Sequence, residues 1–123
     1  MDIETFRNYC LAKAGVTESF PFDKVTLVFK VMGKIFAITG LDNEIFEVNL
    51  KCAPEYAIEL REMYAEIRAG WHMNKKHWNT VQFEGELETD LLLQLIDHSY
   101  ELVVKKLKKS DREILTKMKN GSY

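Results

Sequence analysis

Hydrophobic and polar residues follow two different periods along this chain, and the periods separate helical from extended segments. Apolar residues recur every three or four positions in residues 3–14, which predicts a helix with one buried face. Asp2 precedes this segment as a helix cap and Gly15 follows it as a stop. We expect residues 16–23 to form a loop, because polar residues there surround the anchors Phe20-Pro21-Phe22.

From residue 25 to residue 50 the apolar period changes to two, which indicates strands. Gly33 and Gly40 interrupt the alternation at places suited to turns. Strands joined by such short connections pair as an antiparallel meander. The predicted strands cover residues 25–31, 35–39 and 46–50.

Pro54 suits the first turn of a second helix. Four glutamates form one stripe on it, which we interpret as a solvated face rather than a metal site. The expected inward stripe consists of Tyr56, Leu60, Met63 and Ile67.

A hairpin is predicted after Gly70, with strands at 71–73 and 78–84 around a turn at 74–76. Thr89 can cap a last helix with the broadest apolar face of the chain. That face comprises Leu92, Leu95, Ile96, Ser99, Leu102 and Val103.

These elements predict an α+β fold, in which a three-stranded meander plus a C-terminal hairpin form an antiparallel sheet covered on one face by helices. Residues 1–107 are expected to form a single domain, since 123 residues leave room for one core. Residues 108–123 are either a short appended helix or a flexible tail. No segment is long and apolar enough to span a membrane, and the acidic start is unlike a signal peptide. We therefore expect a cytoplasmic monomer.

The sequence shows no catalytic constellation. Catalysis needs a nucleophile with a base, a carboxylate pair in a cleft, or a set of metal ligands. Cys10 and Cys52 lie far apart in helix or strand patterns, which favours reduced buried thiols. His72 and His77 could face each other across the hairpin, but two ligands are too few for a closed zinc site. We expect no enzymatic activity, cofactor or metal.

The net charge is −2, yet residues 68–78 contain Arg68, Lys75 and Lys76 and no acid. Together with Trp71 and Trp78, this segment combines positive charge with flat aromatic surface, as phosphate contact and base stacking require. Alternatively, the tryptophans are packing anchors and the lysines keep a hairpin tip soluble.

Three segments form distinctive motifs: Gly33-Lys34-Ile35-Phe36-Ala37, His72-Met73-Asn74-Lys75-Lys76-His77-Trp78-Asn79-Thr80 and Asp97-His98-Ser99-Tyr100-Glu101-Leu102-Val103. Together they resemble the MmcQ/YjbR family of small bacterial proteins. The resemblance extends through Leu107 and implies a CyaY-like fold, described as a double-wing DNA-binding motif.

Two functions follow as hypotheses. The first is a module that binds DNA or another nucleic acid through the hairpin and neighbouring lysines. The second is a pocket for a small anionic ligand or a protein partner, formed by the sheet, the hairpin at 72–80 and the loop at 20–22. The candidate binding residues are Lys34, Lys51, His72, Asn74, Lys75, Lys76, His77, Trp78 and Thr80.

Overall fold

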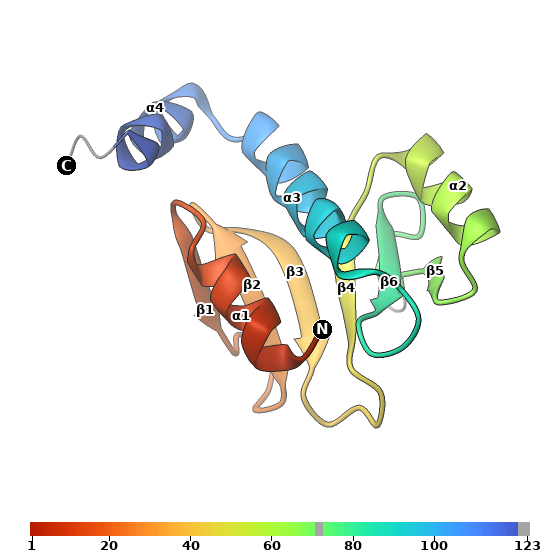
Figure 1. Ribbon diagram of the computed structural model, residues 1–123. Helices are drawn as coiled ribbons and strands as arrows, with labels where there is room; N and C mark the ends of the chain where they lie inside the picture. The colour runs from red at the N-terminus through yellow and green to blue at the C-terminus, as the bar shows by residue number, and fades with distance from the viewer. Residues whose placement is uncertain (71–72, 121–123) are drawn as a thin grey trace.

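A computed structural model describes residues 1–70 and 73–120, and it has an α+β architecture (Figure 1). Within these described residues, four helices and six strands follow one another. In order they are α1 (Ile3–Leu11), β1 (Val16–Ser19), β2 (Thr26–Val31), β3 (Lys34–Gly40), β4 (Glu47–Lys51), α2 (Pro54–Met63), β5 (Ile67–Ala69), β6 (Trp78–Gln82), α3 (Thr89–Lys105) and α4 (Lys109–Lys119). None of the described helices is long and apolar enough to cross a bilayer.

All six strands belong to one antiparallel sheet in the order β1-β2-β3-β4-β6-β5. The meander of β2, β3 and β4 confirms the prediction from the period-two pattern. The expectation of a loop at 16–23 is wrong for its first half, because Val16–Ser19 pairs with β2 as an edge strand. Only alternate residues of β1 are partly buried, so its short polar sequence gives little hydrophobic signal.

Helices α1 and α3 cover one face of the sheet (Figure 1). Phe6 of α1 lies at the centre of the core, with ring centroids 5.3 Å from Phe29, 5.7 Å from Phe46 and 5.3 Å from Phe83. Edge-to-face pairs of this kind add about 0.5–1.5 kcal/mol beyond the burial of their area. This cluster attaches α1 to β2, to the residue before β4 and to the residue after β6.

The second helix is shorter than its apolar pattern predicted. It ends at Met63, which is 68% exposed, and the chain then turns so that Ile67 begins β5. Ala57 and Leu60 are the buried residues of α2. The predicted first hairpin strand at 71–73 lies largely outside the described residues, and the strand that pairs with β6 on this side is β5.

Helix α3 contacts a different element through each residue of its Asp97–Tyr100 segment. Asp97 accepts hydrogen bonds from the Tyr9 hydroxyl and the Lys13 ammonium, both on or just after α1. His98 Nε2 accepts from the Ala53 backbone N–H at 3.1 Å, just before α2. The Tyr100 hydroxyl donates to the carbonyl oxygen of Ala14 at 2.7 Å. Tyr100 is buried and Leu102 only partly so, which turns the buried face of α3 slightly from the predicted one.

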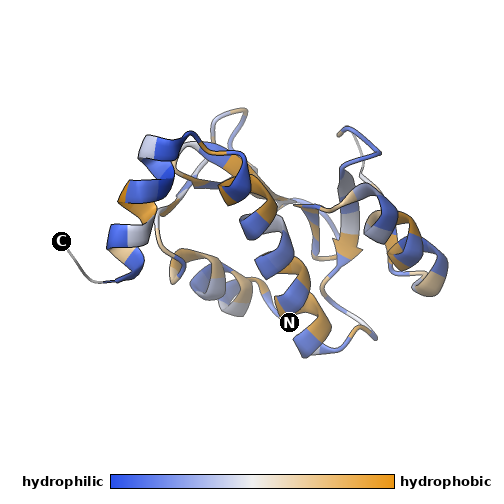
Figure 2. Ribbon diagram, turned by 90° about the horizontal axis from the view of Figure 1, so that it is seen from above, coloured by the Kyte–Doolittle hydropathy of each residue, from blue (hydrophilic) through white to orange (hydrophobic). Residues whose placement is uncertain are grey.

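The segment after residue 107 continues as helix α4. It is mostly hydrophilic, with one hydrophobic band visible from above (Figure 2), and only Leu115 is fully buried. Leu115 packs against Gly15, where an added Cβ would lie 2.6 Å from the Leu115 methyl carbon. Gly15 also has φ of +73°, a conformation that other residues rarely adopt. A glycine is therefore required here both for the conformation of the turn and for the close packing of α4 against it.

We predict that His98 makes stability depend on pH. Burial lowers the pKa of His98 from its ordinary value of 6.5, so the unfolded chain binds a proton more readily than the folded protein. Its contribution to stability is complete above pH 6.5 and is lost as the pH falls through the folded-state pKa. We expect the free energy of unfolding in urea to fall less between about pH 7.5 and pH 5 in His98→Gln than in the unmodified protein, because the glutamine amide does not titrate. Its oxygen can still accept the hydrogen bond from the Ala53 N–H. Equal losses in both proteins would contradict this role.

Candidate functional site: the basic end of the sheet

A hollow of about 350 Å³ lies where β3 begins and β4 ends. Lys34, Lys51 and Lys106 line it, with Ile35 and Val103 as apolar walls. These three lysines come from the first residue of β3, the last residue of β4 and the residue that caps α3. The fold thus brings together charges that are up to 72 positions apart in the sequence.

The hydroxyl of Ser99 separates β3 from β4 at this hollow. The ladder pairs Ala37 with Leu50, so its continuation would place Phe36 opposite Lys51. Instead, Ser99 Oγ donates to the Phe36 carbonyl at 2.5 Å and accepts from the Lys51 backbone N–H at 2.8 Å. One side-chain hydroxyl therefore replaces a direct bond between the strands, and the strands part beyond it.

Lysine charges in the hollow repel one another. The pKa of Lys51 is lowered, first by burial of its side chain and second by the positive charge of Lys106. Among the described residues, the three ion pairs found are Arg7–Glu18, Lys13–Asp97 and Arg68–Glu47. None of them neutralises the hollow, so an anion bound there would relieve the repulsion.

The turn before β6 is ordered by its own backbone and by α2. The Asn74 side chain accepts from the Lys76 N–H at 2.9 Å, and the Asn74 carbonyl accepts from the N–H groups of His77 and Trp78. Arg61 of α2 donates to the Lys75 carbonyl. This arrangement leaves the side chains of Lys75 and Lys76 exposed.

Three other candidate residues are buried or partly buried, in β6 or just before it. Thr80 is 1% exposed and its hydroxyl donates to Asn49 Oδ1 at 2.5 Å, so it is an internal member of the sheet rather than a surface contact. Trp78 is partly buried and pairs with Lys51 across the ladder. His77 is also partly buried, and its carbonyl accepts from the Cys52 N–H at 2.8 Å. Trp71 and His72, including the conceivable His72–His77 metal pair, lie outside the described residues.

The structure contradicts a pocket shared by the hairpin and the 20–22 loop. The 20–22 loop connects the end of β1 to the start of β2. The turn at 74–77, in contrast, precedes the start of β6, which pairs with the end of β4. Strand β2 spans six residues, or roughly 20 Å. The two segments therefore lie at opposite strand ends.

Charge is segregated between the two ends of the sheet. The connections at the end where β3 begins, counted with the residues that flank them, carry nine lysines and no acid: Lys13, Lys34, Lys51, Lys75, Lys76, Lys105, Lys106, Lys108 and Lys109. We call this the basic end. At the opposite, acidic end the connections carry one lysine, Lys24, against nine acids: Asp2, Asp23, Asp42, Glu44, Glu47, Glu66, Glu84, Glu86 and Glu88. A net charge of −2 conceals this separation.

The chain is thus a small α+β domain with one six-stranded antiparallel sheet and a basic end. It belongs to the YjbR family, whose model matches residues 11–102.

Bacterial relatives and solved structures agree with this assignment. The chain is 33% identical to the Escherichia coli protein YjbR over 118 residues, covering 96% of this chain and 100% of that protein. It is 36% identical to Escherichia coli YbdF over 110 residues, covering 89% and 90%. The crystal structure of Deinococcus radiodurans DR2400, a DUF419 domain, superposes with a TM-score of 0.86 at 38% identity, covering 93% of this chain and 87% of that chain. A Pseudomonas syringae crystal structure superposes with a TM-score of 0.72 at 28% identity, covering 83% and 98%.

Replacing Ser99 with alanine should destabilise the protein markedly. The change leaves the Phe36 carbonyl and the Lys51 N–H without their shared partner, and a buried unpaired polar group costs about 1–3 kcal/mol. We expect Ser99→Ala to lower the free energy of unfolding in urea by about 2–4 kcal/mol. The matched control is Ser110→Ala at an exposed position of α4, which should change it by less than about 0.5 kcal/mol. Similar values for both variants would show that Ser99 does not hold the strands.

Proposed function

We propose that this protein is a non-enzymatic module that binds nucleic acid through phosphate contacts at the basic end. The observation that carries the proposal is the collection of nine lysines, without an acid, on the connections at one end of the sheet; one of the nine, Lys13, is paired with Asp97 of α3. Phosphate contacts of this kind supply essentially all of the affinity in binding that does not depend on base sequence. Membership of the YjbR family is compatible with this function but does not specify it.

Helix electrostatics explain only part of the basic end. Lys105, Lys106 and Lys108 follow α3, where positive charge complements the negative end of the helix dipole. That reason does not apply to Lys34 and Lys51, which terminate strands. Their proximity to Lys106 raises the electrostatic energy of the unbound protein, which favours a binding role.

The basic end offers two kinds of contact. The hollow can take one phosphate group between its lysines, and the exposed Lys75 and Lys76 can reach a second phosphate further along the strand ends. Adjacent strands of a sheet twist by roughly 20–25°, so these contacts follow a curved edge. Trp78, paired with Lys51, adds an aromatic ring next to the charges.

The salt dependence of binding tests the proposal. We expect duplex and single-stranded oligonucleotides to bind at low ionic strength, with an affinity that falls as salt rises. Lys34→Gln with Lys51→Gln should reduce the slope of log K against log salt by about 1–2, since each lost phosphate contact removes about 0.7–0.9. Fluorescence anisotropy over a salt series measures both quantities.

Lys24→Glu is a matched control, because it changes the net charge by the same two units but at the acidic end. It should leave the slope within about 0.3 of the unmodified protein. Equal effects of the two variants would mean that net charge alone controls binding. If no oligonucleotide binds at low salt, the proposed function is rejected.

The volume of the hollow favours a second candidate function, recognition of a small anionic ligand. Ligand pockets span about 300–1,000 Å³, and the hollow is about 350 Å³. Thermal shift with inorganic phosphate and nucleoside monophosphates discriminates the candidates. Stabilisation by a monophosphate without oligonucleotide binding would favour the small ligand.

A further inference from the structure

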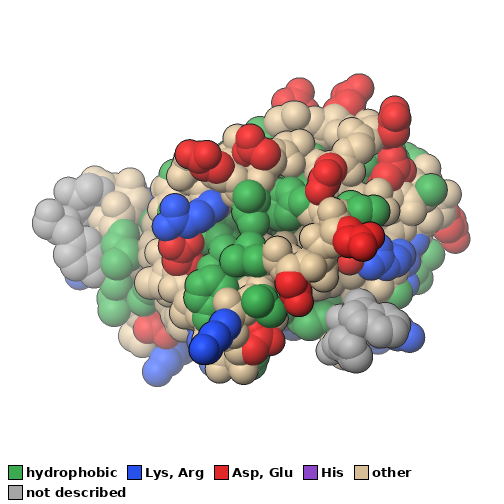
Figure 3. All heavy atoms as spheres, turned by 90° about the horizontal axis from the view of Figure 1, so that it is seen from below, with side chains coloured by type: hydrophobic (Ala, Val, Ile, Leu, Met, Phe, Trp, Pro, Cys, Tyr) green, Lys and Arg blue, Asp and Glu red, His purple; other side chains and the backbone are tan. Residues whose placement is uncertain are grey.

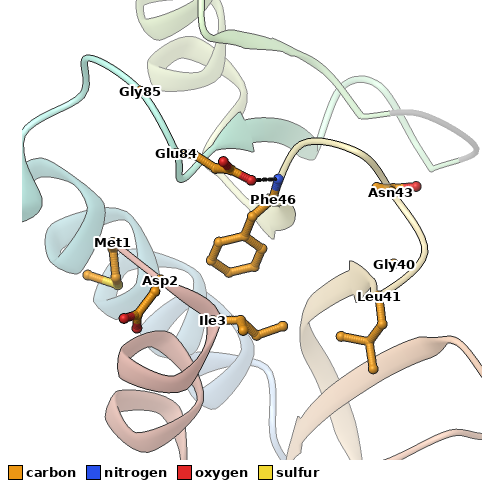
Figure 4. A pocket seen from close by; sticks show the side chains of 9 residues that line it. All are labelled: Met1, Asp2, Ile3, Gly40, Leu41, Asn43, Phe46, Glu84 and Gly85. Carbon is orange, nitrogen blue, oxygen red and sulfur yellow. Dashed lines mark hydrogen bonds between the residues drawn. The ribbon is translucent and has the colours of Figure 1, made fainter.

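A second cavity lies at the acidic end, away from the hollow of the basic end. It has a volume of about 590 Å³, within the usual range for small-molecule sites. The start of α1, the β3–β4 connection and the β6–α3 connection form its walls (Figure 4). Its lining consists of Met1, Asp2, Ile3, Gly40, Leu41, Asn43, Phe46, Glu84 and Gly85.

Hydrogen bonds hold these walls in place without a ligand. Glu84 Oε1 accepts from the Phe46 N–H at 2.6 Å and so joins the two connections (Figure 4). Asp2 Oδ1 accepts from the Thr5 N–H at 2.8 Å and caps α1. The Leu41 N–H donates to the Val25 carbonyl at 2.7 Å, which fixes the β3–β4 connection to the residue just before β2. A cavity whose walls are preformed avoids the ordering entropy of binding.

The cavity exposes apolar side chains to solvent. Ile3 is 36% exposed and Leu41 is 46% exposed, and Ile3 lies between Phe46 and Leu41 in the close view (Figure 4). Seen from below, hydrophobic side chains form a central area whose border is mostly acidic, with some Lys or Arg side chains beside it (Figure 3). Contiguous exposed apolar surface with a polar border is typical of a binding site.

The net charge of the cavity is negative, because the carboxylates of Asp2 and Glu84 outnumber the Met1 ammonium group, which also lies in the lining and donates to the Phe83 carbonyl at 2.9 Å. Asp2 and Glu84 each use one carboxylate oxygen for the backbone contact described above, and Asp2 also receives a hydrogen bond from the Thr5 side chain. Each carboxylate oxygen has two lone pairs, so both groups can still accept a further hydrogen bond from a ligand. The hydrogen bonds from Thr5 lower the pKa of Asp2, so this group is ionised at neutral pH. The surrounding acidic end adds charges of the same sign and one lysine. This environment attracts organic cations and repels carboxylates and phosphates.

We propose that the cavity binds a small organic amine with an apolar body, such as an arylalkylamine. The apolar body lies against Ile3, Leu41 and Phe46, and the ammonium group faces the carboxylates of Asp2 and Glu84. This site is separate from the basic end and does not depend on the proposed nucleic-acid function.

Binding of three matched probes tests the ligand class. Phenethylamine, benzyl alcohol and phenylacetate share an aromatic ring but differ in charge. In a titration of the ¹⁵N-labelled protein, phenethylamine should shift the amide signals of Leu41, Asn43 and Gly85 most strongly. We expect the alcohol to bind about 5–10-fold more weakly and the anion not to bind, since 1.4 kcal/mol corresponds to tenfold. Equal binding of amine and anion, or no shift with amine, would overturn the proposal.

Two substitutions separate the apolar and the charged contributions. Leu41→Ser should weaken phenethylamine and benzyl alcohol alike, by about 5-fold, through loss of apolar contact. Glu84→Gln keeps an acceptor for the Phe46 N–H and should weaken only the amine. Ile58→Ser is the control, because Ile58 is 52% exposed on α2 outside the cavity lining. A comparable loss of affinity in this control would show that binding is nonspecific.

Discussion

The hydroxyl of Ser99 lies between the Phe36 carbonyl of β3 and the Lys51 N–H of β4, and much of this structure depends on that position. It satisfies two buried backbone groups and keeps the two central strands apart beyond Ala37 and Leu50. The hollow of the basic end exists because the strands part there. Ser99 also fixes the rotation of α3, so that its neighbours on either side reach other elements.

Those neighbours explain why a polar run can lie within the most apolar helix. Asp97 contacts the α1 region, His98 the start of α2 and Tyr100 the turn before β1. Successive residues of a helix point about 100° apart, which excludes a joint catalytic site but suits three separate contacts. The polar segment therefore positions α3 over the sheet, and the lysine that caps α3 reaches the hollow as a result.

The sequence was sufficient to predict the meander and helix α3, because their apolar periods are long and regular. It was insufficient for Val16–Ser19, whose edge position needs few apolar residues, and for Ile67, whose spacing continued the helical pattern although the chain leaves the helix at Met63. Lys34 and Lys51 were recognisable as candidate contacts by type. The position of Lys106 beside them was not predictable, since only the packing of α3 brings it there. The acidic-end cavity was also unpredictable, because three segments that are distant in the sequence form it.

Segregation of charge between the sheet ends is the central functional claim, and it can be tested by locating bound nucleic acid on the protein. A DNA duplex carrying a nitroxide spin label should broaden the amide signals of Gly33, Lys51 and Lys106 in a ¹⁵N-labelled sample at low ionic strength. The signals of Leu41 and Gly85 at the acidic end should remain sharp. Broadening centred on the acidic end, or spread evenly over the whole protein, would contradict the account.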